Sequence, residues 1–182
     1  RTQQRHSRAI FSSFPDVGVA YNASWFGNFF ETAAAGGQNV ARFWLHADGC
    51  AGLVYSSDKS VTGLTPSFTA DLAALAKQAQ DHKIVLQICL WSFDMCKKNE
   101  HPGDPHANLI SDASATQSYL DKALVPMLKA LSTFENIIIE VINEPEWCIR
   151  EAPGNTDVQV SLVEMQRFVG MIAQTVHKHG KK

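Results

Sequence analysis

The sequence has little excess charge of either sign and no long hydrophobic run. Its 182 residues include 16 Lys and Arg and 18 Asp and Glu, which gives a formal net charge of −2 at pH 7. The opposite charges are interspersed, so the chain lacks the basic surface of a nucleic-acid-binding protein. No apolar stretch approaches the roughly 20 residues of a membrane-spanning helix. We therefore expect neither nucleic acid nor a membrane as a partner, and the composition predicts a single domain over residues 1–182.

The sequence contains only four cysteines, which are too few for a disulfide scaffold at this length. Their spacing matches no zinc motif. Cys89 lies within a predicted strand and is expected to be a buried free thiol. Cys50, Cys96 and Cys148 each follow a predicted strand, in loops at one edge of the sheet. In a secreted protein, neighbouring strands favour a bridge between Cys96 and Cys148. Four reduced thiols are the alternative.

The chain does contain four repeats of strand, loop and helix. The apolar runs predict strands at 17–22, 39–46, 84–91 and 137–143. Thr65-Pro66, Ser114 and Ser161 are predicted to begin the longer helices, and Pro126 should kink one of them. The residues expected to face the core are Phe68, Leu72, Leu75, Ala76 and Ala79 in one helix, and Tyr119, Leu120, Ala123, Leu124, Met127, Leu128 and Leu131 in the next. This alternation predicts an α/β fold with a parallel sheet.

The most informative segment is Ile137–Trp147, with the sequence IIIEVINEPEW. Its branched apolar residues predict a buried parallel strand, and Glu144 follows directly at the carboxyl end of that strand. Ligands and catalytic groups of α/β proteins collect at this end of the sheet. Pro145 cannot donate to a strand ladder, so it turns the chain outward after Glu144. The pattern indicates an exposed carboxylate on a rigid support, which suits a general acid.

Six separated segments together resemble a known family. In chain order they are GVAYNASWFGN, NVARFWLHADG, LQICLWSFDM, LVPMLKAL, IIIEVINEPEW and MQRFVGM. They are similar to the retaining glycoside hydrolases of clan A, and most of all to the endo-β-1,4-mannanase-like members of family 5. The resemblance implies a TIM (β/α)8 barrel, of which this chain would supply the first four strand–helix units. It also implies a secreted enzyme that acts on a β-linked polysaccharide, with mannan and glucan both open, and it implies no cofactor.

The resemblance assigns roles to three residues. Glu144 matches the acid/base, which protonates the leaving glycosidic oxygen and then deprotonates the incoming water. Asn143 matches the residue that binds the sugar 2-hydroxyl. Arg42 matches the arginine that orients the nucleophile carboxylate, a task that suits a permanently charged guanidinium. Glu140 is expected to point into the barrel, either as a second catalytic group or, more in keeping with burial, as a partner of Arg42.

Four further residues lie at or just after predicted strand ends, and we expect them to bind substrate: Trp44, His46, Trp91 and Trp147. Flat apolar rings at these positions would stack on sugar faces, although packing beneath loops is an equally good interpretation for each tryptophan. No metal site is expected. The only candidate, His101, Asp104 and His106, has a spacing that matches no known ligand set.

The sequence departs from the family pattern in one respect. The family's nucleophile follows the seventh barrel strand, and a whole barrel takes about 250 residues, so we expect this chain alone to be inactive. The missing half could be a separate chain, a second copy could close the barrel, or the chain could be a piece of a longer enzyme. A non-catalytic carbohydrate-binding protein and a structural secreted protein are the alternative functions.

Overall fold

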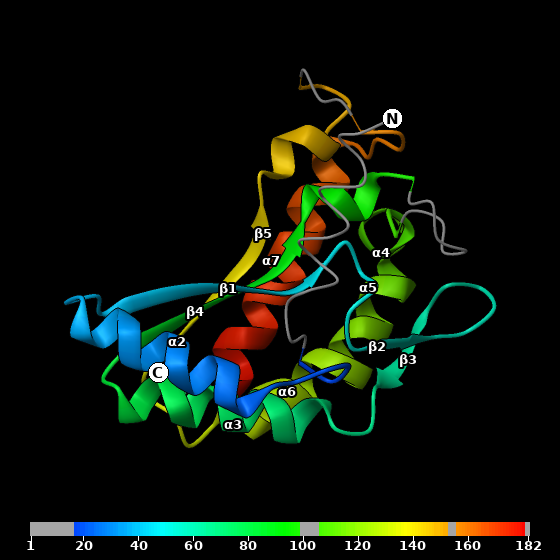
Figure 1. Cartoon of the computed structure of the whole chain (residues 1–182). Coiled ribbons are helices and arrows are strands. Elements are labelled where there is room, and N and C mark those ends of the chain that lie inside the picture. The colour runs from blue at the N-terminus through cyan, green and yellow to red at the C-terminus, as the bar shows by residue number, and fades with distance from the viewer. Residues whose placement is uncertain (1–16, 99–105, 153–155, 181–182) are drawn as a thin grey trace.

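A parallel sheet with the strand order β1-β4-β5 forms the centre of the fold (Figure 1). The computed structural model describes residues 17–98, 106–152 and 156–180. Within these ranges the strands are β1 Val40–Ala47, β2 Leu53–Tyr55, β3 Val61–Leu64, β4 Val85–Ser92 and β5 Ile137–Asn143. The helices and helical turns are α2 Ala23–Ala35, α3 Phe68–Asp81, η1 Phe93–Cys96, α4 Asn108–Ser111, α5 Ala113–Tyr119, η2 Leu120–Leu124, α6 Val125–Leu131, η3 Pro145–Cys148 and α7 Leu162–His179.

The three strands of the central sheet agree with the sequence-based prediction. β5 has the predicted bounds, and β1 and β4 differ from theirs by one residue at each end. β4 lies between the other two strands, and both pairings are parallel. Both edges of β4 are therefore paired, and six of its eight residues are buried, which agrees with its nearly continuous apolar sequence. The α/β prediction with a parallel sheet is therefore confirmed.

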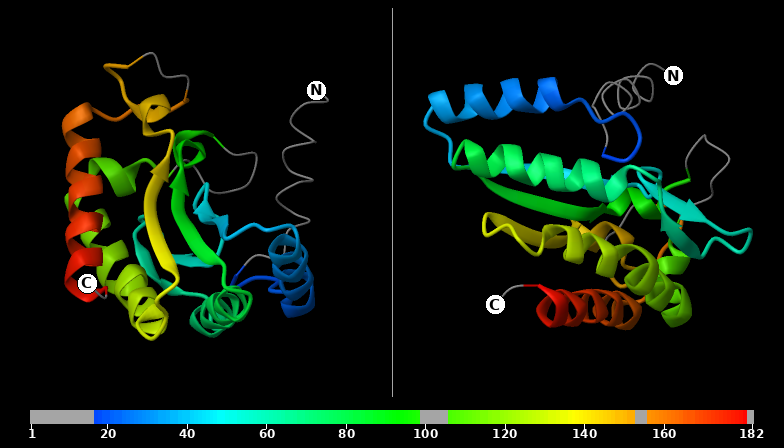
Figure 2. Two further views of the ribbon diagram at one scale, coloured as in Figure 1. Left: turned by 90° about the vertical axis from the view of Figure 1, so that its left-hand side faces the viewer. Right: turned by 90° about the horizontal axis from the view of Figure 1, so that it is seen from below.

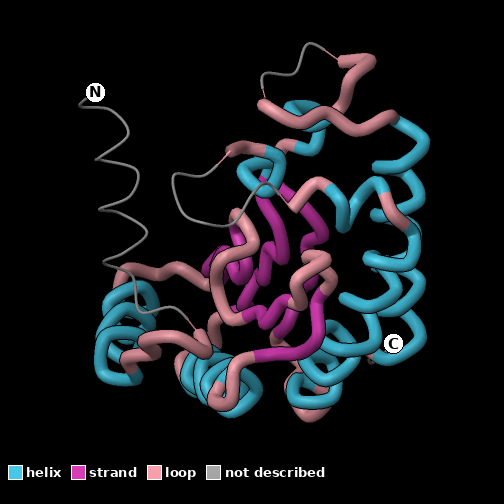
Figure 3. The backbone as a smooth tube through the Cα atoms, turned by 90° about the vertical axis from the view of Figure 1, so that its right-hand side faces the viewer, coloured by secondary structure: helices cyan, strands magenta, loops and turns pink. Residues whose placement is uncertain are grey.

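One layer of helices covers the outer face of the sheet. α2 reaches β1 through Phe26, whose ring meets that of Phe43 edge-on at 5.6 Å. α3 packs on β4, and α7 packs on β5. Figure 2 (right) shows α2, α3, α6 and α7 side by side in this order, and Figure 3 shows the helices on an arc around the strands. All residues that the sequence predicted to face the core in α3 and in the α5–α6 segment are buried.

The helix starts agree less well with the prediction. Asp112, and not Ser114, caps α5, because its carboxylate accepts a hydrogen bond from the Ser114 N–H at 2.8 Å. α3 begins at Phe68, and the Thr65 hydroxyl donates instead to the carbonyl oxygen of Gly18 at 2.6 Å. The α7 start is confirmed as a capping box between Ser161 and Glu164. A π-helical turn, Leu120–Leu124, directly precedes α6, in which Pro126 is the second residue.

The strand predicted at 17–22 is wrong, because residues 17–20 form a turn and α2 begins at Ala23. Both backbone groups of Gly18 are engaged by the start of α3. Its N–H donates to the Asp71 carboxylate at 3.0 Å, and its carbonyl accepts from Thr65. Gly18 also has a φ of +77°, and a Cβ there would lie 2.5 Å from Phe68. These contacts hold the segment against α3, away from any strand ladder.

The long loop predicted after the β1 strand contains a structure that the sequence analysis did not find. β2 and β3 form an antiparallel hairpin between β1 and α3, which projects beside α5 in Figure 1. Each strand is short, so neither carries a clear alternating pattern. All four cysteines are free thiols in this structure, which does not contain the expected bridge between Cys96 and Cys148, and Cys89 is buried as predicted. Among the described residues, no helix combines the length and the apolar character needed to cross a membrane.

Candidate functional site

The parallel register brings polar side chains from three strands onto the inner face of the sheet. Arg42 in β1 lies opposite Gln87 in β4, and Cys89 in β4 lies opposite Glu140 in β5. Residues that are opposite one another in a parallel sheet point to the same face. Asn143 ends β5 and Glu144 follows it, so both lie at the carboxyl edge of this face.

Arg42 is the centre of the resulting hydrogen-bond network. Its Nε and Nη2 donate to the two carboxylate oxygens of Glu140 at 2.8 and 2.6 Å. Nη2 also donates to the Asn143 Oδ1 at 2.8 Å. Gln87 donates to the Glu140 Oε2 at 2.8 Å. A two-point contact between guanidinium and carboxylate fixes the orientation of both groups, so Arg42 and Glu140 together hold the Asn143 amide.

The charges of this pair are mutually stabilised. The hydrogen bond from Arg42 lowers the pKa of Glu140 to about 2, against an opposing contribution from burial, and Gln87 adds a smaller lowering. The same contact raises the pKa of Arg42. The exposed fractions of the two side chains are 38% and 24%, so the pair is only partly screened by solvent. The prediction that Glu140 is the partner of Arg42 is confirmed. Gln87, the one polar residue of its predicted strand, was a signal for this network that the sequence analysis did not use.

Glu144 continues the network to the rim of the sheet. The Asn143 amide donates to the Glu144 Oε2 at 3.0 Å, and the Glu144 side chain is exposed. The backbone of Glu144 is left-handed, with φ 51° and ψ 53°. A non-glycine residue in this region stores about 1–3 kcal/mol of strain, and such residues cluster at functional sites. Pro145 then begins η3, so the chain turns away directly after the carboxylate.

Trp44 and Trp147 lie near this carboxylate end and are half-buried. The Arg42 Cζ lies 5.6 Å from the centre of the Trp44 ring, a cation–π contact that orients the ring. Trp147 lies in η3, and its ring is tilted against Phe93 with the centroids 6.0 Å apart. Each ring keeps some exposed surface, so sugar stacking by these two residues stays a prediction.

His46 and Trp91 were expected to bind substrate, and the structure contradicts this, because neither side chain has any exposed surface. The β1 register shifts between Trp44 and Ala47, and Ala47 has a φ of +52°. Such a bulge turns the following side chains in a new direction. The His46 ring stacks on Phe68 and lies 5.1 Å from Trp91. The same burial lowers the pKa of His46 to about 4, so the ring is neutral near pH 7. Predicted strand ends alone could not reveal this irregularity.

Of the three residues weighed as a metal site in the sequence, only His106 falls within the described residues. His101 and Asp104 lie outside them. His106 is buried, with its ring stacked on Tyr55 at 4.4 Å. The described ranges contain no group of three or more His, Cys, Asp or Glu side chains that could hold a metal ion.

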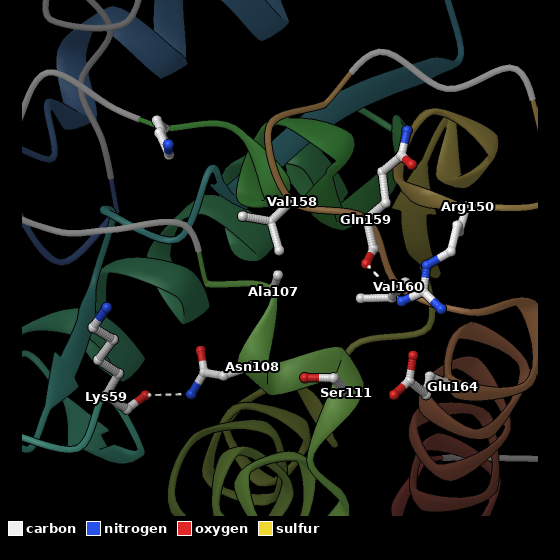
Figure 4. Close-up of a pocket in the computed structure, with 10 residues that line it drawn as sticks. Lys59, Ala107, Asn108, Ser111, Arg150, Val158, Gln159, Val160 and Glu164 are labelled. Carbon is white, nitrogen blue, oxygen red and sulfur yellow. Dashed lines mark hydrogen bonds between the residues drawn. The ribbon is translucent and has the colours of Figure 1, made fainter.

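A separate cavity of about 430 Å³ lies beside α4 and the start of α7 (Figure 4). No residue of the Arg42–Glu140–Asn143–Glu144 network lines it. Several of its polar groups already have partners: Glu164 belongs to the α7 capping box, and Arg150 donates to the Gln159 carbonyl. We therefore place the candidate site at Glu144, where an exposed carboxylate, an oriented amide and a strained backbone coincide.

No known family model matches the chain. Two curated proteins are similar to it in sequence. Mannan endo-1,4-beta-mannosidase from Mytilus edulis is 29% identical over 122 residues, which are 66% of this chain and 32% of the relative. The protein of the same name from Cryptopygus antarcticus is 28% identical over 151 residues, 81% of this chain and 38% of the relative. The chain resembles the family 5 endo-β-1,4-mannanases.

Solved structures support this mannanase-like assignment. The β-mannanase of Mytilus edulis superimposes with a TM-score of 0.74 at 25% identity, over 86% of this chain and 48% of the mussel protein. The mannanase of Cryptopygus antarcticus, at 21% identity, gives 0.78 over 91% of this chain and 50% of its own and supports the fold alone. The chain therefore spans about half the length of these solved structures, and a smaller share of the curated relatives. Its parallel sheet corresponds to part of their TIM barrel.

Proposed function

We propose that this chain carries the acid/base side of the active site of an endo-acting retaining glycoside hydrolase for β-1,4-mannan. One observation carries the proposal: Glu144 is an exposed carboxylate at the carboxyl end of β5, connected through Asn143 to Arg42. The names of the mannan-cleaving relatives support the substrate class. A polysaccharide of this kind lies outside cells, so we also propose that the protein is secreted.

In the proposed mechanism, Glu144 first donates its proton to the glycosidic oxygen that leaves. It then acts as the base that removes a proton from the attacking water. Asn143 accepts from Arg42 and donates to Glu144, so its amide is oriented before substrate arrives. We propose that the Asn143 amide binds the 2-hydroxyl group of the sugar. Arg42 binds Glu140 and Asn143 through Nε and Nη2, and we assign its Nη1 to the nucleophile.

We propose that the nucleophile lies outside these 182 residues. Glu140 is poorly suited to the task, since Arg42 and Gln87 engage both of its carboxylate oxygens. No Asp or Glu follows Glu164 in the 182 residues. We propose that the sheet is one side of a (β/α)8 barrel, that this chain supplies the first half, and that the second half supplies a carboxylate about 5–5.5 Å from Glu144. A second copy of the chain is the competing way to close the barrel.

The test is a single polypeptide in which this chain precedes the complementary half of the Mytilus edulis β-mannanase. Reducing-sugar release from mannan is measured for Glu144→Gln and, as a matched control, for Glu146→Gln, because both residues are exposed and lie two positions apart. We expect Glu144→Gln to lower the rate about 10²–10⁴-fold and Glu146→Gln to leave it nearly unchanged.

Affinity electrophoresis of the chain alone in gels with and without mannan separates the alternatives. A folded fusion that releases no sugar, together with retardation of the chain by mannan, would instead indicate a carbohydrate-binding protein. No hydrolysis and no retardation would indicate a structural role. Equal rates for the two glutamine variants would remove Glu144 from the mechanism.

A further inference from the structure

Cys96 and Cys148 end two short helical turns that lie side by side. η1 directly follows β4, η3 follows β5 after Glu144, and these two strands are neighbours in the sheet. The turns pack on each other, with the Phe93 and Trp147 rings in contact. The Cys148 thiol also donates to the carbonyl oxygen of Phe93, with 3.5 Å between sulfur and oxygen. Both cysteine side chains are fully buried.

A third segment holds the backbones of both cysteines. The Val158 N–H donates to the Cys96 carbonyl at 3.1 Å, and the Val160 N–H donates to the Cys148 carbonyl at 2.9 Å. Amide groups two residues apart are separated by at most about 7 Å along an extended chain. Residues 158–160 therefore bind both cysteine backbones at neighbouring points of one short segment, which favours the close approach that a disulfide requires.

The electrostatic environment of the Cys96 thiol also reflects the nearby Cys148. A hydrogen bond between the two thiols raises the pKa of the Cys96 thiol, and burial adds a smaller rise. The other cysteines have different surroundings. The buried Cys89 thiol donates to the carbonyl oxygen of Trp91 at 3.2 Å, and Cys50 is exposed beside Asp48. The structure therefore presents one pair of thiols suited to bonding and two cysteines that can serve as internal controls.

We propose that Cys96 and Cys148 form a disulfide that joins η1 to η3 when the protein folds in an oxidising compartment. The oxidant is a small disulfide such as oxidised glutathione. One cysteine thiolate attacks it and releases one reduced glutathione, and the second thiolate then attacks the mixed disulfide and releases the other. Two cysteine S–H bonds and the glutathione S–S bond are lost. One protein S–S bond and two glutathione S–H bonds are formed.

The proposed bond would also fix the turn that presents Glu144. The Trp147 N–H donates to the Glu144 carbonyl at 3.2 Å, within the turn that Cys148 ends. Tying Cys148 to η1 therefore restrains this turn against the end of β4. We expect amide hydrogen exchange at Trp147 to be slower in the oxidised protein than in the reduced one.

Alkylation and mass spectrometry test the bond directly. The chain is refolded with a mixture of reduced and oxidised glutathione or with dithiothreitol, then denatured without reductant, alkylated and digested. We expect only Cys50 and Cys89 to be alkylated in the oxidised sample, which should also contain a linked Cys96–Cys148 peptide pair, and all four cysteines to be alkylated in the reduced sample. Full alkylation in both samples, or a link that involves Cys50 or Cys89, would overturn the proposal.

Thermal unfolding gives an independent measurement. We expect dithiothreitol to lower the Tm of the oxidised wild-type chain by about 5–15 °C, as loss of a disulfide does in a chain of this size. Cys96→Ser and Cys148→Ser should show no shift with reductant, and Cys50→Ser should show the wild-type shift. If the serine variants do not fold, the wild-type and Cys50→Ser shifts decide. The absence of a shift in both would contradict the proposal.

Discussion

The two faces of the central sheet differ in polarity and in how far the helices cover them. On the outer face, Leu86, Ile88 and Leu90 of β4 are buried beneath helices. On the inner face, Arg42, Gln87 and Glu140 form a charged network beside Ile138, which is 49% exposed. Apolar burial contributes most of the free energy of folding, whereas partly exposed ion pairs contribute little. The outer face therefore holds the fold together, and the inner face positions the candidate site.

The largest difference in stability is expected between variants of two tryptophans, Trp91 and Trp44. Trp91→Ala should destabilise the protein by about 3–5 kcal/mol, because it empties a fully buried space between His46 and Tyr119. Trp44→Ala should change stability little and weaken retardation in mannan gels. Urea unfolding and affinity electrophoresis of both variants measure these effects. If Trp44→Ala were the more destabilising of the two, its assignment to the ligand-facing side would be wrong.

The same substitution, isoleucine to alanine, can be made on each face of the sheet, at Ile88 and at Ile138. Ile88→Ala removes a fully buried side chain on the outer face and should lower the free energy of unfolding by about 2–4 kcal/mol. Ile138→Ala changes an exposed position on the inner face and should lower it by less than about 1 kcal/mol. The midpoints of urea unfolding give both values. Similar losses would mean that the inner face is covered in solution, for example by a second copy.

The smallest effect concerns titration of the inner face. Arg42 lowers the pKa of Glu140 from 4.5 to about 2, so the contact stabilises the protein above pH 4.5 and loses this effect as the pH falls through about 2. In Arg42→Met, we expect the pKa of Glu140 to return toward its ordinary value. Carbon-13 NMR of the glutamate carboxyl groups measures it, with Arg150→Met as the control cation. If the pKa of Glu140 were the same in Arg42→Met as in the wild type, Arg42 would not be the main cause of its lowering.

Much of the fold and part of the site could be predicted from the sequence. The continuous apolar run at 137–143 correctly predicted β5, and helical periodicity correctly predicted the buried residues of α3. The partnership of Arg42 with Glu140 was also within reach, because a charged residue in a strand needs a partner. The bulge in β1 that buries His46 and the turn at Gly18 could not be predicted. Both depend on contacts with distant residues, Phe68 for the first and Asp71 and Thr65 for the second.

The most direct test of the account is a crystal structure of the chain with a manno-oligosaccharide bound. We predict a sugar oxygen within hydrogen-bonding distance of the Glu144 carboxylate, a second sugar oxygen at the Asn143 amide, and a sugar ring on Trp44 or Trp147. An oligosaccharide bound instead in the cavity beside Arg150 and Glu164, with Glu144 making no contact to it, would contradict the assignment of Glu144 as the acid/base.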